Sequence, residues 1–316
     1  MNKLNKSSKI YIAGHLGMVG SSCWRILFNS GYKNLIGLSS DDLDLRNQRD
    51  VYNYIYNNKP DIIINAAAKV GGIIANDTYP YDFIMDNMKI QNNLIDSAHK
   101  SDVNNFIFIG SSCIYPKNSH QPIKEEYLLT DSLEPTNQWF AIAKISGVKT
   151  IDALRRQYNR NYLTLMSTNL YGPNDNFDLN NSHVLPAMLR KFHNAAKNKH
   201  ADVNLWGSGT PMREFLYVDD LANAVLFAIN NNLEDNIYNI GTGIDISISN
   251  LAKAIQEVTS HKGNIFWDSS KPDGTLRKLL DISKIKQLGY SHKYSLNDGL
   301  IKTYKWFLDN QNSIRR

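Results

Sequence analysis

A glycine-rich turn near the N-terminus carries the clearest chemical signal in the sequence. Gly14, Gly17 and Gly20 directly follow an apolar run, and an amphipathic segment begins near Val19. Glycines let a backbone approach a pyrophosphate closely, and a helix N-terminus supplies unpaired N–H groups and a partial positive charge. A strand, a glycine turn and a helix in this order predict a dinucleotide-binding site.

The pattern around this turn is one of strands that alternate with helices. Short β-branched runs predict strands at residues 10–13, 35–38, 62–66, 106–110 and 162–166. Amphipathic stretches between them predict helices at residues 19–30, 51–58, 81–100 and 139–158. This alternation indicates an α/β fold: a Rossmann-type, doubly wound parallel sheet covered by helices on both faces.

The second half of the chain follows a looser pattern. After Pro173, segments rich in proline and glycine separate the helices. We therefore expect a dinucleotide-binding domain at residues 1–172 and a smaller C-terminal substrate-binding lobe at residues 173–316. Residues 219–243 predict a helix followed by a strand, so part of 215–245 is expected to return to the Rossmann domain.

Composition and charge exclude several classes of protein. With 316 residues, 42% of them hydrophobic, the chain can bury a core for one large domain, or for a large and a small one, without disulfides or metals. The formal charge of +5 and the pI near 8.9 are spread along the chain, with no basic run. This distribution argues against nucleic-acid binding and suggests mild attraction to anionic ligands.

The N-terminus and the cysteines indicate the compartment. The first residues, MNKLNKSSK, are polar, and the apolar run that follows is too short for a signal sequence or a membrane span. Two cysteines, Cys23 and Cys113, cannot form a disulfide framework. We expect a cytoplasmic protein with no membrane contact and no metal site, in which Cys23 is a core residue.

Further strings of residues, distributed nearly end to end, carry a family resemblance. They are AAAKVGGI (66–73), GSSCIYPK (110–117), AIAK (141–144), TNLYGPNDNF (168–177), NSHVLPA (181–187), WGSGTPMREF (206–215) and KPDGT-x-RKLLD (271–281). With them the chain resembles the extended short-chain dehydrogenase/reductases, and closely the GDP-L-fucose synthase family. The resemblance implies an NADP-dependent 3,5-epimerase/4-reductase that acts on a GDP-4-keto-6-deoxy sugar.

Epimerisation beside a ketone needs a base that removes a carbon-bound proton and an acid that returns one to the opposite face. The resemblance implies that Cys113 is the base and His183 the acid. Taken alone, a cysteine after a strand is more often a core residue, and His183 would be an ordinary loop histidine. The surrounding strings GSSCIYP and NSHV favour the catalytic roles.

Reduction at C4 needs a hydride and a proton, and the proton normally comes from a tyrosine whose pKa is lowered by a lysine four residues later. Here the motif has Phe140 and Lys144, so the lysine is kept and the hydroxyl is gone. The resemblance implies that Lys144 binds the cofactor ribose and that Ser111 or Ser112 still binds the C4 oxygen. Loss of one general acid slows a step by roughly 100- to 10,000-fold, so we expect weakened reduction.

Two explanations fit Phe140. One is a laboratory Tyr-to-Phe substitution that traps bound ligand, which the intact neighbourhood favours. The other is a natural relative that has given up reduction.

The resemblance also assigns cofactor-binding residues, and two departures from its pattern concern the 2′-phosphate of NADP. The residues implied are Gly14, Gly17, Met18, Val19, Gly20, Ser39, Ser40, Ala66, Ala67, Lys144 and His183. Where this family usually has arginines, the chain has Leu16 and, after the second strand, Ser39 and Ser40. Asp41 and Asp42 lie slightly later, so no acid at the strand end clearly favours NAD. We expect NADP(H), with NAD(H) open.

A GDP-sugar needs cations for its diphosphate and flat or apolar walls for its purine. The residues that match are Asn169, Val184, Leu185, Lys191, Trp206, Arg213 and Lys278. Alone, Lys191 would be a solvated helix charge and Trp206 a core or rim aromatic. Arg213, inside the distinctive PMREF string, is the firmest assignment.

Two alternatives concern the substrate and the class of protein. The substrate could be another GDP-4-keto sugar, such as a 6-deoxyheptose or a dideoxyhexose. A non-catalytic dinucleotide-binding protein is the alternative from another class, and the retention of Cys113, Lys144 and His183 argues against it. Relatives commonly form homodimers through two long helices, which here correspond to residues 81–100 and 139–158, so the resemblance implies a homodimer.

Overall fold

The structure of the chain, a computed structural model, describes residues 4–179, 181–199, 201–271, 273–312 and 314. Pro272, in the last of the family strings, lies outside these residues. In the described part, no helix combines the length and the apolar character needed to cross a membrane.

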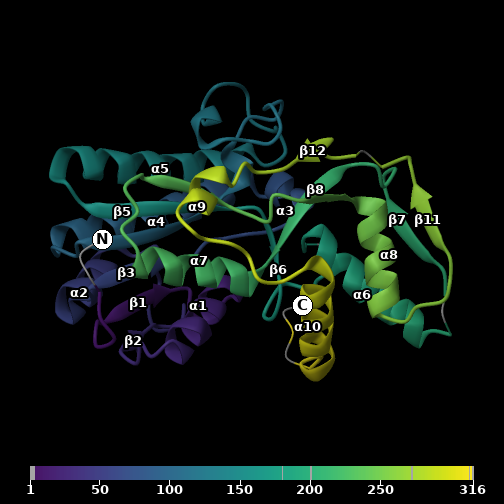
Figure 1. Cartoon of the computed structure of the whole chain (residues 1–316), viewed down its shortest axis with the longest axis horizontal. Helices are drawn as coiled ribbons and strands as arrows, with labels where there is room; N and C mark the ends of the chain where they lie inside the picture. Colours follow the sequence, from purple (N-terminus) through teal and green to yellow (C-terminus); the bar gives the residue numbers. More distant parts are fainter. Residues whose placement is uncertain (1–3, 180, 200, 272, 313, 315–316) are drawn as a thin grey trace.

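A parallel six-stranded sheet forms the larger part of the molecule (Figure 1). In order across the sheet, its strands are β2 (Leu35–Ile36), β1 (Ile10–Ala13), β3 (Ile62–Asn65), β4 (Asn105–Ser111), β5 (Asn161–Ser167) and β9 (Ile237–Ile240). All neighbouring strands run parallel. The strand β9 pairs with β5 although the smaller lobe begins between them in sequence, so the chain returns to the main sheet.

Helices cover both faces of this sheet (Figure 1). They are α1 (Met18–Asn29), α2 (Gln48–Asn58), α4 (Pro80–Lys100), α5 (Gln138–Tyr158) and α7 (Val218–Asn230). Alternate strand residues point to opposite faces: Ile10 and Ile12 share a buried cluster with residues of α1 and α7, whereas Tyr11 and Ala13 share one with residues of α2, α4 and α5. The apolar runs are therefore buried on both sides, as in a parallel sheet.

The strand order places a ligand crevice next to β1. From β1 the chain moves to β2 on one side and then crosses to β3 on the other. Where connections leave in opposite directions, a crevice opens outside the carboxyl ends of the strands. The glycine turn after Ala13 and the segment after Asn65 flank this crevice.

A smaller lobe follows, at the right of Figure 1. Its four-stranded sheet contains β6 (Asn169–Tyr171), β8 (Met212–Tyr217), β10 (Asp245–Ser247) and β12 (Arg277–Lys278), and β7 (Val203–Trp206) pairs with β11 (Ile265–Asp268). The accompanying helices are α6 (Val184–Lys197), α8 (Ile248–Val258) and α10 (Leu296–Asp309). The short helix α9 (Ser283–Gln287) packs instead against β9 of the main sheet, and its Ile285 lies in a buried cluster of that sheet. Leu189, Phe192, Leu251 and Phe307 form part of the lobe's own buried core.

The predicted fold class is confirmed, and the strands and helices expected in the first half all form, with ends within three residues of those predicted. Cys23 is fully buried, as expected of a core residue. The sequence did not predict α3 (Ile73–Thr78), because its residues follow two glycines that indicate a turn. Two short 3₁₀ helices, at Ser112–Ile114 and Glu125–Tyr127, were also not predicted.

Candidate active site

The glycine turn has the close packing that a pyrophosphate site needs. Gly14 has a φ of +79°, and a Cβ there would lie 2.9 Å from the backbone of Ala67. A Cβ at Gly20 would collide with the Gly14 carbonyl oxygen. Gly17 is the N-cap of α1, and among the described residues no side chain caps the helix and no acid lies in its first turn. The first N–H groups of α1, those of Met18, Val19 and Gly20, therefore suit an anion.

Ala66 and Ala67 border the turn on its other side. The Ala66 N–H donates to the carbonyl oxygen of Ala13 at 3.0 Å, and the Ala67 N–H donates to Asn65 Oδ1 at 3.1 Å. These two bonds hold the segment after β3 against the end of β1.

The end of β2 fits a 2′-phosphate less well. Leu16 is 60% exposed and brings no charge. The hydroxyl of Ser39 donates to the Asp42 carboxylate at 2.6 Å, so the chain folds back and sets an acid beside the serine. Sequence spacing alone placed Asp42 beyond the strand end. Ser40 is exposed, and residues 39–50 contain four aspartates and two arginines, which makes this segment negative.

Ser111 and Cys113 lie at the carboxyl end of β4. Ser111 ends the strand, and its hydroxyl accepts a bond from the Cys113 N–H at 3.4 Å. Cys113 is only 8% exposed, and this burial raises the pKa of its thiol. The positive charges of Lys278 and Lys144 act in the opposite direction and lower that pKa. The thiol thus has cations nearby from both parts of the molecule.

Phe140 and Lys144 are one helical turn apart at the start of α5, and so share a face of that helix. The Phe140 ring packs edge-on against Phe83 of α4, with 6.5 Å between centroids. Lys144 is buried, and its Nζ donates to the Ile109 carbonyl oxygen at 3.0 Å and lies 5.7 Å from the Phe140 ring centroid. Burial lowers the pKa of Lys144 from 10.5 to about 8, so its ammonium predominates at pH 7.

His183 is the N-cap of α6, and the two residues before it contact the segment that follows β3. The Gly72 N–H donates to the Asn181 carbonyl oxygen at 2.9 Å, and a Cβ at Gly72 would lie 2.7 Å from the Ser182 carbonyl oxygen. The His183 side chain is accessible to solvent, yet the surrounding protein lowers the pKa of its imidazole.

The expected sugar-nucleotide residues lie in the smaller lobe. Trp206 is 57% exposed, and the ammonium groups of Lys191 and Lys271 lie 5.6 and 5.7 Å from its ring. Arg213 of β8 and Lys278 of β12 are paired in register, and burial lowers the pKa of both.

Three further expected residues surround this group. Asn169 lies on β6, beside β8, and its side chain is half-buried. Val184 is exposed at the start of α6. Leu185 is buried within the core of the lobe, so its side chain serves packing.

The family model of the NAD dependent epimerase/dehydratase family matches residues 10–241. The chain belongs to this family. It is 52% identical over 306 residues to GDP-L-fucose synthase 1 of Arabidopsis thaliana, covering 97% of this chain and 95% of that relative. It is 49% identical over 316 residues to the GDP-L-fucose synthase of Escherichia coli strain K12, covering 97% and 98%. The predicted resemblance is thereby confirmed.

A solved structure gives the same result for this family member. A GDP-mannoheptose C4 reductase from Campylobacter jejuni, with NADP bound, is 35% identical and superimposes with a TM-score of 0.89 over 96% of this chain and 99% of that one.

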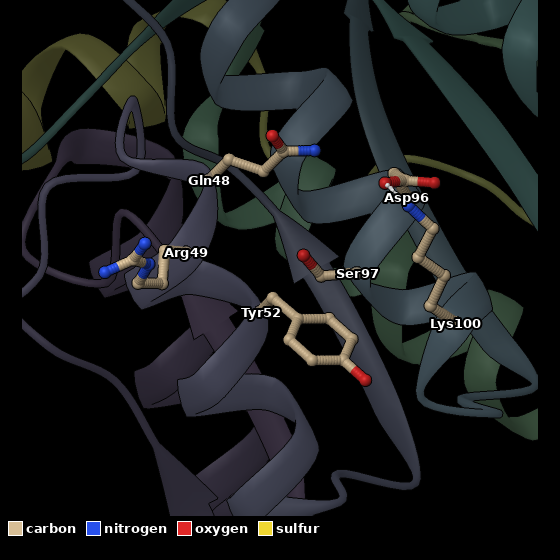
Figure 2. Close-up of a pocket in the computed structure, with 6 residues that line it drawn as sticks. All are labelled: Gln48, Arg49, Tyr52, Asp96, Ser97 and Lys100. Carbon is tan, nitrogen blue, oxygen red and sulfur yellow. Dashed lines mark hydrogen bonds and ion pairs between the residues drawn. The ribbon is translucent and has the colours of Figure 1, made fainter.

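One surface hollow lies apart from these residues. It has a volume of about 290 Å³ and lies between α2 and α4, where Tyr52 faces Ser97 and the Asp96–Lys100 ion pair (Figure 2). None of the expected site residues lines it, and its lysine is already paired with an acid on the same helix. We assign it no part in the chemistry of this epimerase/dehydratase family member.

Proposed function

We propose that the chain is a GDP-sugar 3,5-epimerase/4-reductase of the GDP-L-fucose synthase type in which the C4 reduction step is weakened. The observation that carries the proposal is the convergence of Ser111, Cys113 and Lys144 at the carboxyl ends of the strands. There Cys113 lies within the electrostatic reach of Lys278 from the smaller lobe. The same activity is supported by the sequence identity of about one half that the chain shares, over nearly its full length, with GDP-L-fucose synthases.

Epimerisation is the work of Cys113 and His183 in this proposal. The Cys113 thiolate accepts the proton of the C3–H or C5–H bond, and the bonding electrons move toward the C4 oxygen to give an enolate. Lys278 and Lys144 favour the thiolate and oppose the effect of burial. His183 then returns a proton to the opposite face from its imidazolium form, which its lowered pKa makes scarcer but a stronger acid. A proton from the Cys113 thiol returns to the imidazole through solvent, so solvent hydrogen enters the sugar.

Phe140 separates hydride transfer from proton delivery. NADP(H) supplies the hydride when it is bound. Lys144 holds the ribose hydroxyls with its ammonium, and Ser111 donates a hydrogen bond to the C4 oxygen. The alkoxide that forms has no phenol from Phe140 to protonate it, so its proton must come from a weaker donor or from water.

The cofactor end of the site accepts the dinucleotide but discriminates weakly at the 2′ position. The glycine turn suits the pyrophosphate, since the α1 N–H groups lack an acidic neighbour in the first turn. Leu16 and the Ser39–Asp42 bond supply no cation for a 2′-phosphate. We therefore infer that NADP(H) is used, as the NADP-bound Campylobacter jejuni structure suggests, and that NAD(H) competes with it more effectively than in family members that have the arginines.

In this proposal the GDP portion binds against the smaller lobe. Residues 1–172 form the cofactor domain and residues 173–316 the substrate lobe, except that part of 215–245 returns to the cofactor domain. Trp206 offers a flat face to the purine, and the nearby ammonium groups of Lys191 and Lys271 offer charge to the diphosphate. Asn169, Val184, Arg213 and Lys278 complete the site.

The deciding experiment is solvent exchange. The protein is incubated in D₂O with GDP-4-keto-6-deoxymannose, and deuterium at C3 and C5 is measured by mass spectrometry and NMR. We expect uptake at both carbons and slow NADPH oxidation. If neither C3 nor C5 takes up deuterium, the epimerase proposal is overturned.

A second candidate substrate is a GDP-4-keto-heptose. The structural similarity to the GDP-mannoheptose C4 reductase favours it. The same exchange experiment with a GDP-4-keto-6-deoxyheptose, or with a dideoxyhexose analogue, compares the substrates directly. A purely dinucleotide-binding role would show cofactor affinity and no exchange with any of them.

The proposed assembly is a homodimer through α4 and α5. These helices pack together, and between them lies a hollow of about 280 Å³ lined by Asn92, Ile95, Asp96, His99, Thr150 and Leu154. Ile142 and Trp139 of α5 are each 37% exposed, which leaves apolar surface on that helix. Light scattering after size-exclusion chromatography tests the assembly, and a monomeric mass would contradict it.

A further inference from the structure

Glu214 is a fully buried carboxylate in the strand that also carries Arg213. Its Oε1 accepts bonds from the N–H groups of Thr242 and Gly243, at 2.6 and 2.7 Å. Its Oε2 accepts a bond from the Leu280 N–H at 3.1 Å. The two oxygens therefore bind two different segments: the turn that follows β9, and the residues just after β12.

The backbone of the same residue holds a third segment. The Glu214 carbonyl oxygen accepts bonds from Asn169 Nδ2 at 2.8 Å and from Thr168 Oγ1 at 3.2 Å. Glu214 thus joins β6, β8 and β12 at the base of the proposed sugar-nucleotide site. The approach is close, because a Cβ at Gly241 would run into the Glu214 carboxylate.

Burial of a carboxylate is costly, and the hydrogen bonds only partly offset the cost. Burial raises the pKa of Glu214, while its bonds to the N–H groups of Leu280, Gly243 and Thr242 lower it. An apolar side chain would fill the space at lower cost, but it could not hold three N–H groups. The presence of a buried carboxylate is therefore explained by the chain segments that it holds in place.

These segments carry three of the residues expected to hold the GDP-sugar. Asn169 is bound directly, Arg213 is the preceding residue, and Lys278 lies two residues before the bonded Leu280. We propose that Glu214 is a positioning residue that sets the spacing of Asn169, Arg213 and Lys278 around the GDP-sugar. This inference rests on the proposed function, since it takes these three residues as the sugar-nucleotide contacts.

The substitution Glu214→Gln tests the two oxygens separately. An amide keeps one oxygen, which can still accept from the paired N–H groups of Thr242 and Gly243. Its NH₂ group then faces the Leu280 N–H, and two donors repel each other. The variant should keep the turn after β9 in place and displace β12, together with Lys278.

A matched control is Asp220→Asn. Asp220 is also fully buried and also accepts two backbone bonds, from the N–H groups of Lys293 at 2.7 Å and Tyr294 at 3.1 Å. It ties α7 to the segment before α10 and holds none of the three GDP-sugar residues. Both variants remove a buried carboxylate, so they share the general cost to stability.

Three measurements distinguish positioning from stability: GDP affinity and NADP⁺ affinity by calorimetry, and the thermal unfolding midpoint. We expect Glu214→Gln to weaken GDP binding by about ten- to a hundredfold, the loss typical of a charged hydrogen bond, and to leave NADP⁺ affinity within about twofold. The control should lower the midpoint by a similar amount and leave GDP affinity unchanged.

The outcomes separate the inference from the function it rests on. Equal GDP affinity in the unmodified chain, the Gln variant and the control would overturn the positioning role alone. Failure of the unmodified chain to bind GDP would overturn the proposed function. Should the Gln variant not fold, Glu214→Asp keeps the charge but shortens the side chain, and it should also weaken GDP binding while NADP⁺ binding persists.

Discussion

Replacing Phe140 with tyrosine adds one hydroxyl oxygen to the proposed active site. The surrounding structure indicates how far this hydroxyl should raise the rate of C4 reduction. The ring already packs against Phe83, so the phenol needs no new packing of the ring itself. Lys144 follows one turn later on the same helix face, with its Nζ 5.7 Å from the ring centroid. The variant therefore gains a phenol beside an existing ammonium.

The expected gain in C4 reduction is about 100- to 10,000-fold, which corresponds to a barrier lower by ~3–5 kcal/mol. The ammonium sets where in this range the gain falls, since it lowers the pKa of a neighbouring phenol. Because the pKa of Lys144 is about 8, this help is present below pH 8 and is lost as the pH rises above it. The gain should thus be largest below about pH 8.

The assay follows NADPH and NADH oxidation at 340 nm with GDP-4-keto-6-deoxymannose. Phe140→Leu is the control, because it changes the ring without adding a hydroxyl and should show no gain. Deuterium uptake at C3 and C5 should be similar in all three proteins. If the tyrosine variant gains no reductase activity with either cofactor, the assignment of Phe140 to the proton-donor position is wrong.

Three other predictions concern the same site. Lys144→Met should abolish detectable cofactor binding yet raise the stability of the fold. The pKa near 8 corresponds to a burial cost of ~3 kcal/mol, and the lost hydrogen bond to Ile109 costs ~1 kcal/mol. Chemical denaturation at pH 7 should therefore show a gain of ~2 kcal/mol, and a loss of stability would contradict this reasoning. Cys113→Ala should reduce deuterium uptake at least 100-fold and leave NADPH affinity unchanged. In the unmodified chain, the rate at which iodoacetamide alkylates Cys113 should rise with pH beyond 8.5, because burial raises the thiol pKa. An alkylation rate that levels off near neutrality would refute the raised thiol pKa. Leu16→Arg should shift the ratio of NADPH to NADH affinity toward NADPH by about tenfold in fluorescence titrations, since it adds one cation for the 2′-phosphate, and an unchanged ratio would show that Leu16 lies away from that phosphate.

The fold of the first half could be predicted because its signals are local. The run at Ile10–Ala13 is buried on both faces, so it reads as a continuous apolar strand, and the glycines after it mark where the helix begins. The helix α3 could not be predicted in this way. It spans only Ile73–Thr78, and its position depends on the contact between Gly72 and Asn181, far apart in sequence.

The site could be predicted only where family strings or strand ends mark it. Such strings predict Cys113 and Lys144 as site residues, and these roles stay predictions. The structure places Cys113 just after β4 and bonds Lys144 of α5 to Ile109 of the same strand. The bond between Ser39 and Asp42 depends on how the loop after β2 folds back, which spacing does not reveal. The role of Glu214 could not be predicted because its partners at Thr242 and Leu280 are distant in sequence, although an acid inside an apolar strand is a visible signal.

Lys144 is kept in this chain although Phe140 stands where the family motif has tyrosine. A buried ammonium costs free energy, and Phe140 leaves it no phenol to polarise. Among the described residues its one hydrogen-bond acceptor is the Ile109 carbonyl oxygen, whereas an ammonium has three donors. Ribose hydroxyls would satisfy the other two, so retention of Lys144 is best explained by cofactor binding. In the proposed mechanism, holding the cofactor and delivering the C4 proton are therefore separable tasks, and we propose that Phe140 removes only the second.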